Sequence, residues 1–256
     1  AALLPEGEVS LPYFGADSRV TPRDLAQMVD TVTDYSRYAC AETLRQGFLC
    51  LHGGFRLGVC GTAVLRNGAV ASLRDISSLS LRIVTERIGL AEPTADSLFC
   101  AGAFRSTLLL SPPGGGKTTF LRECIRVISS SGVRVAVCDE RSELAAVFRG
   151  VPQFDIGPVS DVMSDIPKSE AALMLLRSMN PQVIAMDEIS SPEDCLAAAS
   201  AVGCGVRVIA TAHAASVSDL KRRNVYRLLL AQDVFKSIVV IENNAGVRSY
   251  RLEMLQ

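Results

Sequence analysis

The stretch TLLLSPPGGGKTTF, residues 107–120, decides the fold of this chain. It matches the phosphate-binding pattern of Gly, four residues and Gly-Lys-Ser/Thr, except that Ser111 stands at the first glycine. The stretch predicts a short buried strand, a glycine-rich turn and a helix with an apolar stripe, which is the context that the pattern requires. A small residue such as serine fits at the entry of the loop if its φ angle is negative. We therefore predict a phosphate-binding loop despite the departure at Ser111.

The residues of this loop suit a polyphosphate. Three consecutive glycines let backbone N–H groups curl around phosphates at a helix N-terminus, where the helix dipole favours anions. Lys117 is expected to reach the β- and γ-phosphate oxygens, and the Thr118 hydroxyl is expected to bind Mg²⁺. The predicted nucleotide-binding residues are Ser111, Pro112, Pro113, Gly114, Gly115, Gly116, Lys117, Thr118 and Thr119.

An acidic pair follows a second apolar run, PQVIAMDEIS at residues 181–190. A buried strand that ends in carboxylates supplies the acidic partner that Mg²⁺ needs beside a phosphate-binding loop. We predict that Asp187 holds the metal through its water shell. Glu188 is then placed to orient or deprotonate the attacking water, which favours hydrolysis over nucleotide binding alone.

A third strand end, in VRVAVCDERSELAAVF at residues 133–148, carries Asp139 and Glu140. The carboxyl ends of neighbouring parallel strands line one crevice, so these carboxylates are expected to face the same nucleotide. Glu140 is therefore an alternative to Glu188 as the general base. The other interpretation is a solvated strand end with Glu143 capping a helix.

A fourth strand end contributes a histidine, His213, in GVRVIATAHAAS at residues 205–216. The small residues around it leave the imidazole free to meet the γ-phosphate. A lone histidine is usually structural, but this one is expected at the same sheet edge as Lys117 and Asp187. We predict that it takes part in catalysis.

Strand and helix patterns alternate from about residue 96 onward, which is typical of an α/β fold with a mostly parallel sheet covered on both faces. The predicted strands are 106–110, 133–138, 182–187, 206–211 and 237–242, and the predicted helices are 117–130, 168–179 and 192–202.

The first part of the chain differs. Thr21 and Pro22 predict the start of a helix, and Asn67-Gly68 between apolar runs predicts a hairpin. We predict a small α+β domain over residues 1–92 and an α/β domain over residues 93–256. Because the first residue is Ala1 rather than Met, we expect a fragment or a processed form.

Composition narrows the class of protein. Hydrophobic residues make up 48% of the 256 residues, enough for a sizeable core, and a net charge of −1 provides no overall basic field for nucleic acid. The eight cysteines form no Cys-x-x-Cys pair and the only histidines are His52 and His213, so no zinc site is expected. Several cysteines, such as Cys138, stand inside apolar runs as small buried hydrophobes, which fits a reducing cytosol rather than a disulfide framework. No run approaches the roughly 18 apolar residues of a membrane span. We expect a cytoplasmic protein.

These motifs together resemble the stage III sporulation protein AA family of spore-forming bacteria. That family is related to the ATPases that power type II and type IV secretion and pilus machines. The resemblance runs from about residue 20 to the end, and it is carried by GFLCLHGGFRLGVCG, ISSLSLRI, SPPGGGKTTFLR, DERSELA, PKSEAALMLLRSMNPQVIAMDEI and GVRVIATAHA. It implies a RecA-like P-loop ATPase domain that uses ATP and Mg²⁺.

The resemblance also implies partners. It implies a homo-oligomeric ring, with a hexamer as the expected size and ATP at the subunit boundary. It further implies peripheral attachment to an integral-membrane protein of a channel between mother cell and forespore. Sites of this kind are usually completed by an arginine from the neighbouring subunit. Arg82 stands where the family's first domain approaches that neighbour, with Arg56 and Arg74 as alternatives, while Arg141 and Arg177 are candidates within the subunit.

Two other classes of function stay open. Helicases and recombinases share the RecA-like core, so a nucleic-acid motor that grips single strands is one alternative. However, aromatic residues make up only 5% of the chain and do not interleave with the arginines of the first domain, so nucleic acid is not an expected partner. A scaffold that binds ATP and barely hydrolyses it is the other alternative, and the two acidic strand ends weigh against it.

Overall fold

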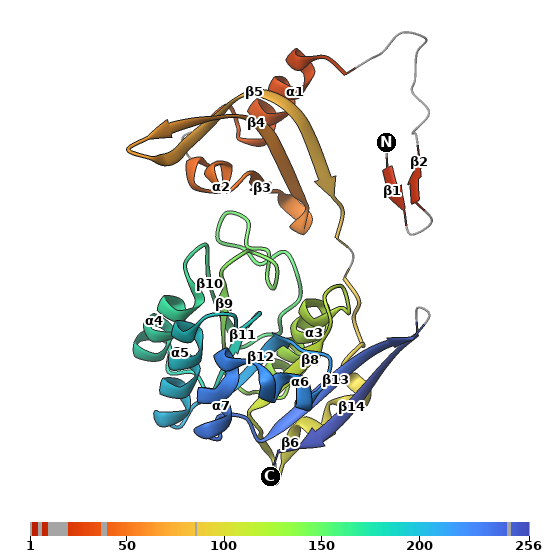
Figure 1. The fold of residues 1–256 in the computed structure, drawn as a ribbon, viewed down its shortest axis with the longest axis vertical. Helices are drawn as coiled ribbons and strands as arrows, with labels where there is room; N and C mark the ends of the chain where they lie inside the picture. The colour runs from red at the N-terminus through yellow and green to blue at the C-terminus, as the bar shows by residue number, and fades with distance from the viewer. Residues whose placement is uncertain are drawn as a thin grey trace. The chain divides into compact units, whose positions relative to one another are not determined.

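The computed structural model describes residues 2–4, 7–9, 20–36, 40–84, 86–244 and 247–255. By their internal contacts, the residues group into two compact units, one of residues 1–51 and 56–82 and one of residues 52–55 and 83–256. Figure 1 shows the elements of both units along the chain. The domain boundary between residues 92 and 93 stays a prediction.

The first unit is a small α+β arrangement. Its helix α1 (Pro22–Val32) begins with a capping box in which Thr21 and Asp24 satisfy each other's backbone N–H groups. Strands β3 (Phe48–Cys50), β4 (Arg56–Arg66) and β5 (Ala69–Arg82) form an antiparallel sheet in that order, and the short helix α2 is Ala41–Arg45. A separate pair is β1 (Ala2–Leu4) with β2 (Gly7–Val9).

The hairpin between β4 and β5 forms as the sequence predicts. Asn67 and Gly68 both have positive φ angles, 54° and 77°, which a tight two-residue turn of type I′ requires. The two strands pack one face over a small core with α1 and α2. Its buried members are Val29, Leu44, Leu49, Leu57, Val59 and Ile76.

The second unit is built on a seven-stranded sheet with the order β10-β9-β11-β12-β8-β13-β14. Six neighbouring strands run parallel and only β14 is antiparallel, to β13. The strands are β8 (Thr107–Ser111), β9 (Val135–Asp139), β10 (Ser160–Ser164), β11 (Val183–Met186), β12 (Arg207–His213), β13 (Ser237–Asn244) and β14 (Val247–Met254). The short pair β6 (Phe99–Cys100) and β7 (Ala103–Phe104) lies outside this sheet. The predicted α/β fold with a mostly parallel sheet is confirmed.

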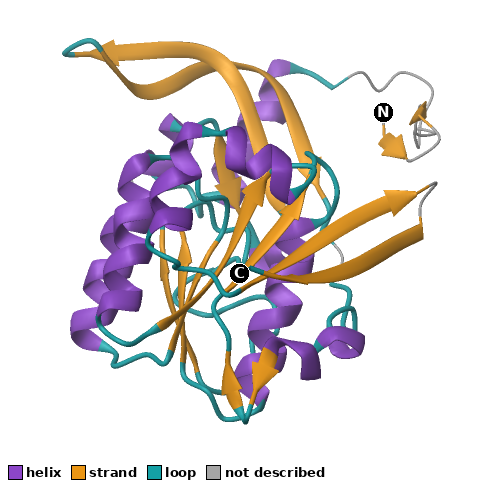
Figure 2. Ribbon diagram, turned by 60° about the horizontal axis from the view of Figure 1, so that its bottom comes forward, coloured by secondary structure: helices purple, strands orange, loops and turns teal. Residues whose placement is uncertain are grey.

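Helices cover both faces of this sheet (Figure 2) because neighbouring side chains of a strand point to opposite faces. In β8, Leu108 and Leu110 belong to one buried cluster, whereas Leu109 belongs to the other. The helix α3 (Lys117–Ser130) supplies the cluster around Leu109. The opposite cluster is supplied by the helices α4 (Lys168–Ser178), α5 (Pro192–Gly203), α6 (Val217–Arg222) and α7 (Arg227–Ala231).

The register of the sheet brings the predicted site residues to one edge. Ser111 at the end of β8 lies opposite His213 at the end of β12. Met186, which precedes the acidic pair, lies opposite Cys138 of β9 and Ala210 of β12. The carboxyl ends of these four strands therefore lie together, at the place where open α/β sheets bind ligands. Among the residues described, no helix is both long and apolar enough to cross a bilayer.

Candidate nucleotide-binding site

The glycine-rich loop joins strand β8 to helix α3. Gly114 and Gly116 have φ angles of 75° and 91°, in the left-handed region that favours glycine, whereas Ser111 does not. The Ser111 side chain is fully buried, and its hydroxyl donates to the Pro112 carbonyl oxygen at 2.8 Å. A Cβ atom added to Gly115 would lie only 1.7 Å from this hydroxyl oxygen. Serine at the entry of the loop is thus accommodated because residue 115 is glycine.

We expect Gly115→Ala to destabilise the protein by about 1–3 kcal/mol, since a buried site has no room for the added methyl group. Ser111→Gly removes the hydroxyl that the methyl group would meet, so the double variant is expected to recover part of that loss. Urea denaturation of the two single variants and the double variant measures the coupling. Gly203→Ala is the matched control, because a Cβ at Gly203 meets nothing within 4 Å. This account of the loop would be contradicted if Gly115→Ala cost no more stability than Gly203→Ala, or if the losses of the two single variants simply added in the double variant.

Lys117, the first residue of α3, folds back over the loop. Its Nζ donates to the carbonyl oxygens of Ser111 and Pro112 at 3.0 and 3.2 Å and lies 2.9 Å from Nδ1 of His213. Burial lowers the pKa of Lys117, and the charges of Asp187 and Glu188 oppose that shift. The structure thus brings together the lysine and the histidine that the sequence places at this edge.

The acidic residue after β11 contacts the helix that follows the loop. The Thr118 hydroxyl donates to one Asp187 carboxylate oxygen at 2.8 Å, and the Thr211 hydroxyl donates to the other at 2.6 Å. A hydroxyl and a carboxylate are hard oxygen ligands that suit Mg²⁺, which usually binds through one or two carboxylates, waters and substrate phosphates. The described residues hold no cluster of three or more His, Cys, Asp or Glu side chains that would form a metal site of protein ligands alone. The residues present therefore fit Mg²⁺ carried with a nucleotide.

The Glu188 side chain contacts other residues than Asp187 does, namely His213 and Arg141. Its φ angle of 47° is unusual for a residue with a side chain and costs on the order of 1 kcal/mol. The backbone N–H of Glu188 donates to the Thr211 hydroxyl at 2.7 Å, which holds this conformation. Its carboxylate lies 3.2 Å from Nε2 of His213 and 3.6 Å from Nη1 of Arg141. An ammonium can only donate, so Nδ1 of a neutral His213 accepts from Lys117, and the imidazole proton is then on Nε2, the nitrogen nearest Glu188.

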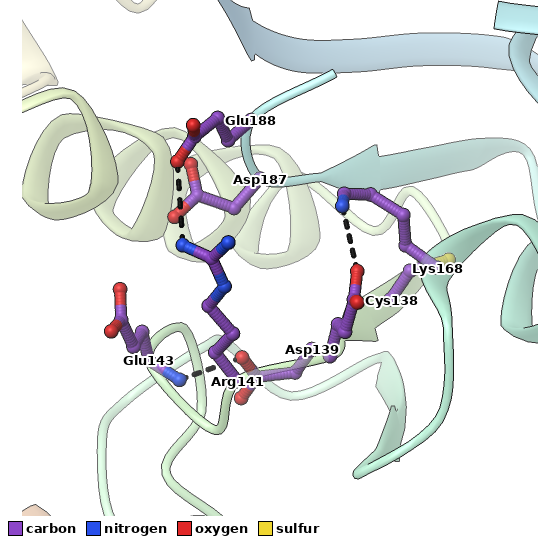
Figure 3. Close-up of a pocket in the computed structure, with 8 residues that line it drawn as sticks. Cys138, Asp139, Arg141, Glu143, Lys168, Asp187 and Glu188 are labelled. Carbon is purple, nitrogen blue, oxygen red and sulfur yellow. Dashed lines mark hydrogen bonds and ion pairs between the residues drawn. The ribbon is translucent and has the colours of Figure 1, made fainter. Parts of the chain in front are cut away.

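A pocket beside Glu188 contains the other acidic strand end (Figure 3). There Glu140 accepts a 2.6 Å hydrogen bond from Nζ of the buried Lys168, which also lies 3.6 Å from Asp194. One oxygen of Glu140 is therefore already engaged by a cation. The pocket is lined by Cys138, Asp139, Glu140, Arg141, Glu143, Lys168, Asp187 and Glu188.

Asp139 differs from its expected role. The sequence suggested that it faces the nucleotide, but its carboxylate accepts from four backbone N–H groups of residues 143–146, at 2.8 to 3.3 Å. Burial raises the pKa of Asp139, and these four donors oppose the shift by stabilising the charged form. No helix begins at Glu143 in this described segment, so the helix-capping interpretation is wrong. Asp139 instead shapes the loop that carries Arg141.

The remaining predicted residues have the following positions. Pro112 accepts from the Gly115 N–H at 3.2 Å, Pro113 lies in the loop, and Thr119 lies in the first turn of α3. Arg82 is the exposed last residue of β5, in the first unit, and Arg177 is exposed in the last turn of α4. The roles assigned to all of these residues stay predictions.

Two residues outside the predicted set, Thr211 and Lys168, also organise this edge. Thr211 precedes His213 by two positions, so both side chains leave β12 on the same face. The spacing Thr-x-His at the end of a strand could therefore have indicated that Thr211 lies at the same edge as His213. Lys168 opens α4 and meets Glu140 across 28 positions of chain, and no local pattern predicts such a contact.

The sheet order, the glycine-rich loop and the acidic strand ends define a RecA-like α/β protein of the P-loop class. The family model for sporulation stage III, protein AA, matches residues 3–250. The chain belongs to this family, and the resemblance predicted from its motifs is confirmed.

Relatives and solved structures agree with this placement. Stage III sporulation protein AA of Bacillus subtilis (strain 168) is 37% identical over 251 residues, 95% of this chain and 80% of that protein. The uncharacterized protein ycf45 of Cyanidium caldarium is 27% identical over 186 residues, 71% of this chain and 53% of that protein.

Two solved structures share the fold. The pilus retraction motor PilT with bound ADP has a TM-score of 0.63 at 19% identity, over 93% of this chain and 72% of that one. The Legionella pneumophila ATPase DotB has a TM-score of 0.56 at 17% identity, over 92% of this chain and 69% of that one.

Proposed function

We propose that this protein is an Mg²⁺-dependent ATPase of the secretion type. The observation that carries the proposal is the 2.8 Å hydrogen bond between Thr118 and Asp187, directly after the phosphate-binding loop. A hydroxyl at the start of the helix and a carboxylate at the end of a neighbouring strand are the pair that holds Mg²⁺ in P-loop nucleotide sites. The ADP bound to PilT, which shares the fold, is consistent with a nucleotide at this edge.

Each residue then has a chemical role. The backbone N–H groups of residues 114–116 and the Lys117 ammonium bind the phosphates, and Thr118 with Asp187 holds Mg²⁺. When bound, the metal would neutralise charge on the phosphate oxygens. Glu188 acts as the base toward the attacking water, because its carboxylate is one-third exposed and its neighbours His213 and Arg141 contact it at more than 3 Å.

Glu140 is the weaker candidate for the base, because the Lys168 ammonium donates to it at 2.6 Å. His213 lies between Lys117 and Glu188 and contacts both. A phosphate group that takes up the Lys117 ammonium would change the surroundings of His213, and through it those of Glu188. We therefore propose that His213 couples the occupancy of the site to the position of the base.

At the level of the assembly, we propose a homo-oligomeric ring, expected to be a hexamer, in which Arg82 of a neighbouring subunit completes the site. Hydrolysis would be converted into movement of one domain against the other. The relationship to stage III sporulation protein AA supports work at a channel between mother cell and forespore. We place the protein on the cytoplasmic side, held at the membrane by an integral-membrane partner.

ATP hydrolysis by the purified protein, measured against protein concentration with and without single-stranded DNA, tests this proposal. We expect the rate per subunit to rise with concentration and to be indifferent to DNA, since sites shared between subunits form only in the oligomer. Hydrolysis that appears only with DNA and falls steeply with salt would instead favour a nucleic-acid motor. ATP binding without turnover at any concentration would favour the scaffold alternative.

A further inference from the structure

The C-terminal hairpin reaches the phosphate-binding loop from within the same chain. In β14, Arg248 and Tyr250 are two residues apart, so both side chains leave the strand on the same face. The Tyr250 ring stacks on that of Phe120 in the first turn of α3, with ring centroids 4.3 Å apart and an angle of 16° between the planes. Phe120 is fully buried. This stack fixes one face of β14 against the N-terminal turn of α3.

On the same face of β14 as Tyr250, the Arg248 guanidinium lies against Gly116. A Cβ atom added to Gly116 would lie 2.9 Å from Cζ, 3.0 Å from Nη2 and 3.1 Å from Nε of Arg248. Because these three distances are nearly equal, the guanidinium lies flat against the glycine. A side chain at residue 116 would occupy this space, so Gly116 serves both the turn of the loop and the approach of Arg248.

Among the residues that the structure describes, none supplies a counter-charge to the Arg248 guanidinium. Within the described part of the chain, its side chain makes no hydrogen bond or ion pair. It is half-buried and shares the N-terminus of α3 with Lys117, where the helix dipole is also positive. An anion bound at this end of the helix is therefore favoured by the dipole as well as by the positive side chains. Arginine, with its fork of N–H donors, is suited to phosphate oxygens.

We propose that Arg248 binds the α- and β-phosphates of the nucleotide in cis. The inference rests on the proposed nucleotide site and adds a binding residue to it. The backbone of a phosphate-binding loop cradles the α- and β-phosphates, while its lysine reaches the β- and γ-phosphates. Arg248, packed on the backbone at Gly116, therefore contacts the phosphates that ADP and ATP share. It contributes to affinity for both nucleotides and leaves the chemical step to Lys117 and Glu188.

Isothermal titration of the full chain with ADP and with a non-hydrolysable ATP analogue, both with Mg²⁺, tests this role. Arg248→Gln is expected to weaken both affinities alike, by about tenfold to a hundredfold, the value of a hydrogen bond to a charged group. KM for ATP should rise correspondingly while kcat at saturating ATP stays within about twofold. Arg248→Lys is expected to recover part of the affinity.

Arg251→Gln is the matched control, since Arg251 lies on the same strand but leaves it on the other face, paired with Glu242 and Glu253. It should bind both nucleotides as the unsubstituted chain does. Thermal unfolding without nucleotide reports whether either variant perturbs the fold. If Arg248→Gln binds ADP within twofold of the unsubstituted chain, the inference is wrong and the proposed function stands. If the unsubstituted chain binds neither nucleotide, the proposed function fails and this inference fails with it.

Discussion

Glu188→Gln is expected to retain ATP binding and to lose turnover, by about a hundredfold to ten-thousandfold, the contribution of a general base. Glutamine keeps the size of the side chain and its contacts with His213 and Arg141, but it cannot accept a proton from water. Binding of a non-hydrolysable analogue and the steady-state rate of phosphate release, measured on the same preparation, separate the two effects.

Glu140→Gln is the matched comparison for Glu188→Gln, since both carboxylates lie in the pocket of Figure 3. Glu140 is bound to Lys168, so its substitution is expected to lower turnover far less. A reversal, with Glu140→Gln inactive and Glu188→Gln active, would move the base to Glu140. Lost nucleotide binding in Glu188→Gln would instead assign a structural role to Glu188, whose φ angle of 47° and hydrogen bond to Thr211 position the chain at this point.

Lys117→Ala is expected to abolish measurable hydrolysis, a loss of about a hundredfold to a thousandfold or more, because the cation that meets the developing phosphate charge is gone. Binding of ATP should weaken as well, since the lysine also contacts the nucleotide before reaction. Phosphate release and analogue titration provide both measurements. An undiminished rate would rule out the assignment of Lys117 as the phosphate clamp.

Lys117→Ala can lower the rate of hydrolysis either by removing the cation or by destabilising the fold. Lys117 donates to the carbonyl oxygens of Ser111 and Pro112, so its removal also takes two hydrogen bonds from the loop. Thermal unfolding of each variant in the absence of nucleotide measures that cost. Lys117→Arg keeps the charge in a longer side chain, and Lys221→Ala removes an exposed lysine from the last turn of α6 as the neutral control.

The parts of the site that sequence predicts are those carried by local patterns. The glycine-rich loop, Lys117 and Thr118 lie within one short stretch, and Asp187 follows a continuous apolar run, so strand, turn and helix are all specified by near neighbours. The same holds for the helix cap at Thr21 and the turn at Asn67 and Gly68. In each case, the physical cause acts over a few residues.

The parts that sequence does not predict depend on contacts between distant segments. Strand β10 (Ser160–Ser164) is an edge strand in which only Val162 and Met163 are apolar and every residue is half-buried, so it lacks the apolar run by which the other strands are found. The direction of the Asp139 carboxylate depends on where the backbone of residues 143–146 returns to it. Arg248 meets Gly116 across more than a hundred positions of the chain.

The contacts of Lys117 set a threshold for any anion that enters the site. Its ammonium already has three partners, so an incoming phosphate has to exchange those bonds for its own and gains only the difference. A free inorganic phosphate ion offers one group for that exchange. A nucleotide offers a chain of phosphates that also meets the loop N–H groups and the metal ligands. Under the proposed function, discrimination against small cellular anions then follows from the resting hydrogen bonds of Lys117, independent of any recognition of the nucleobase.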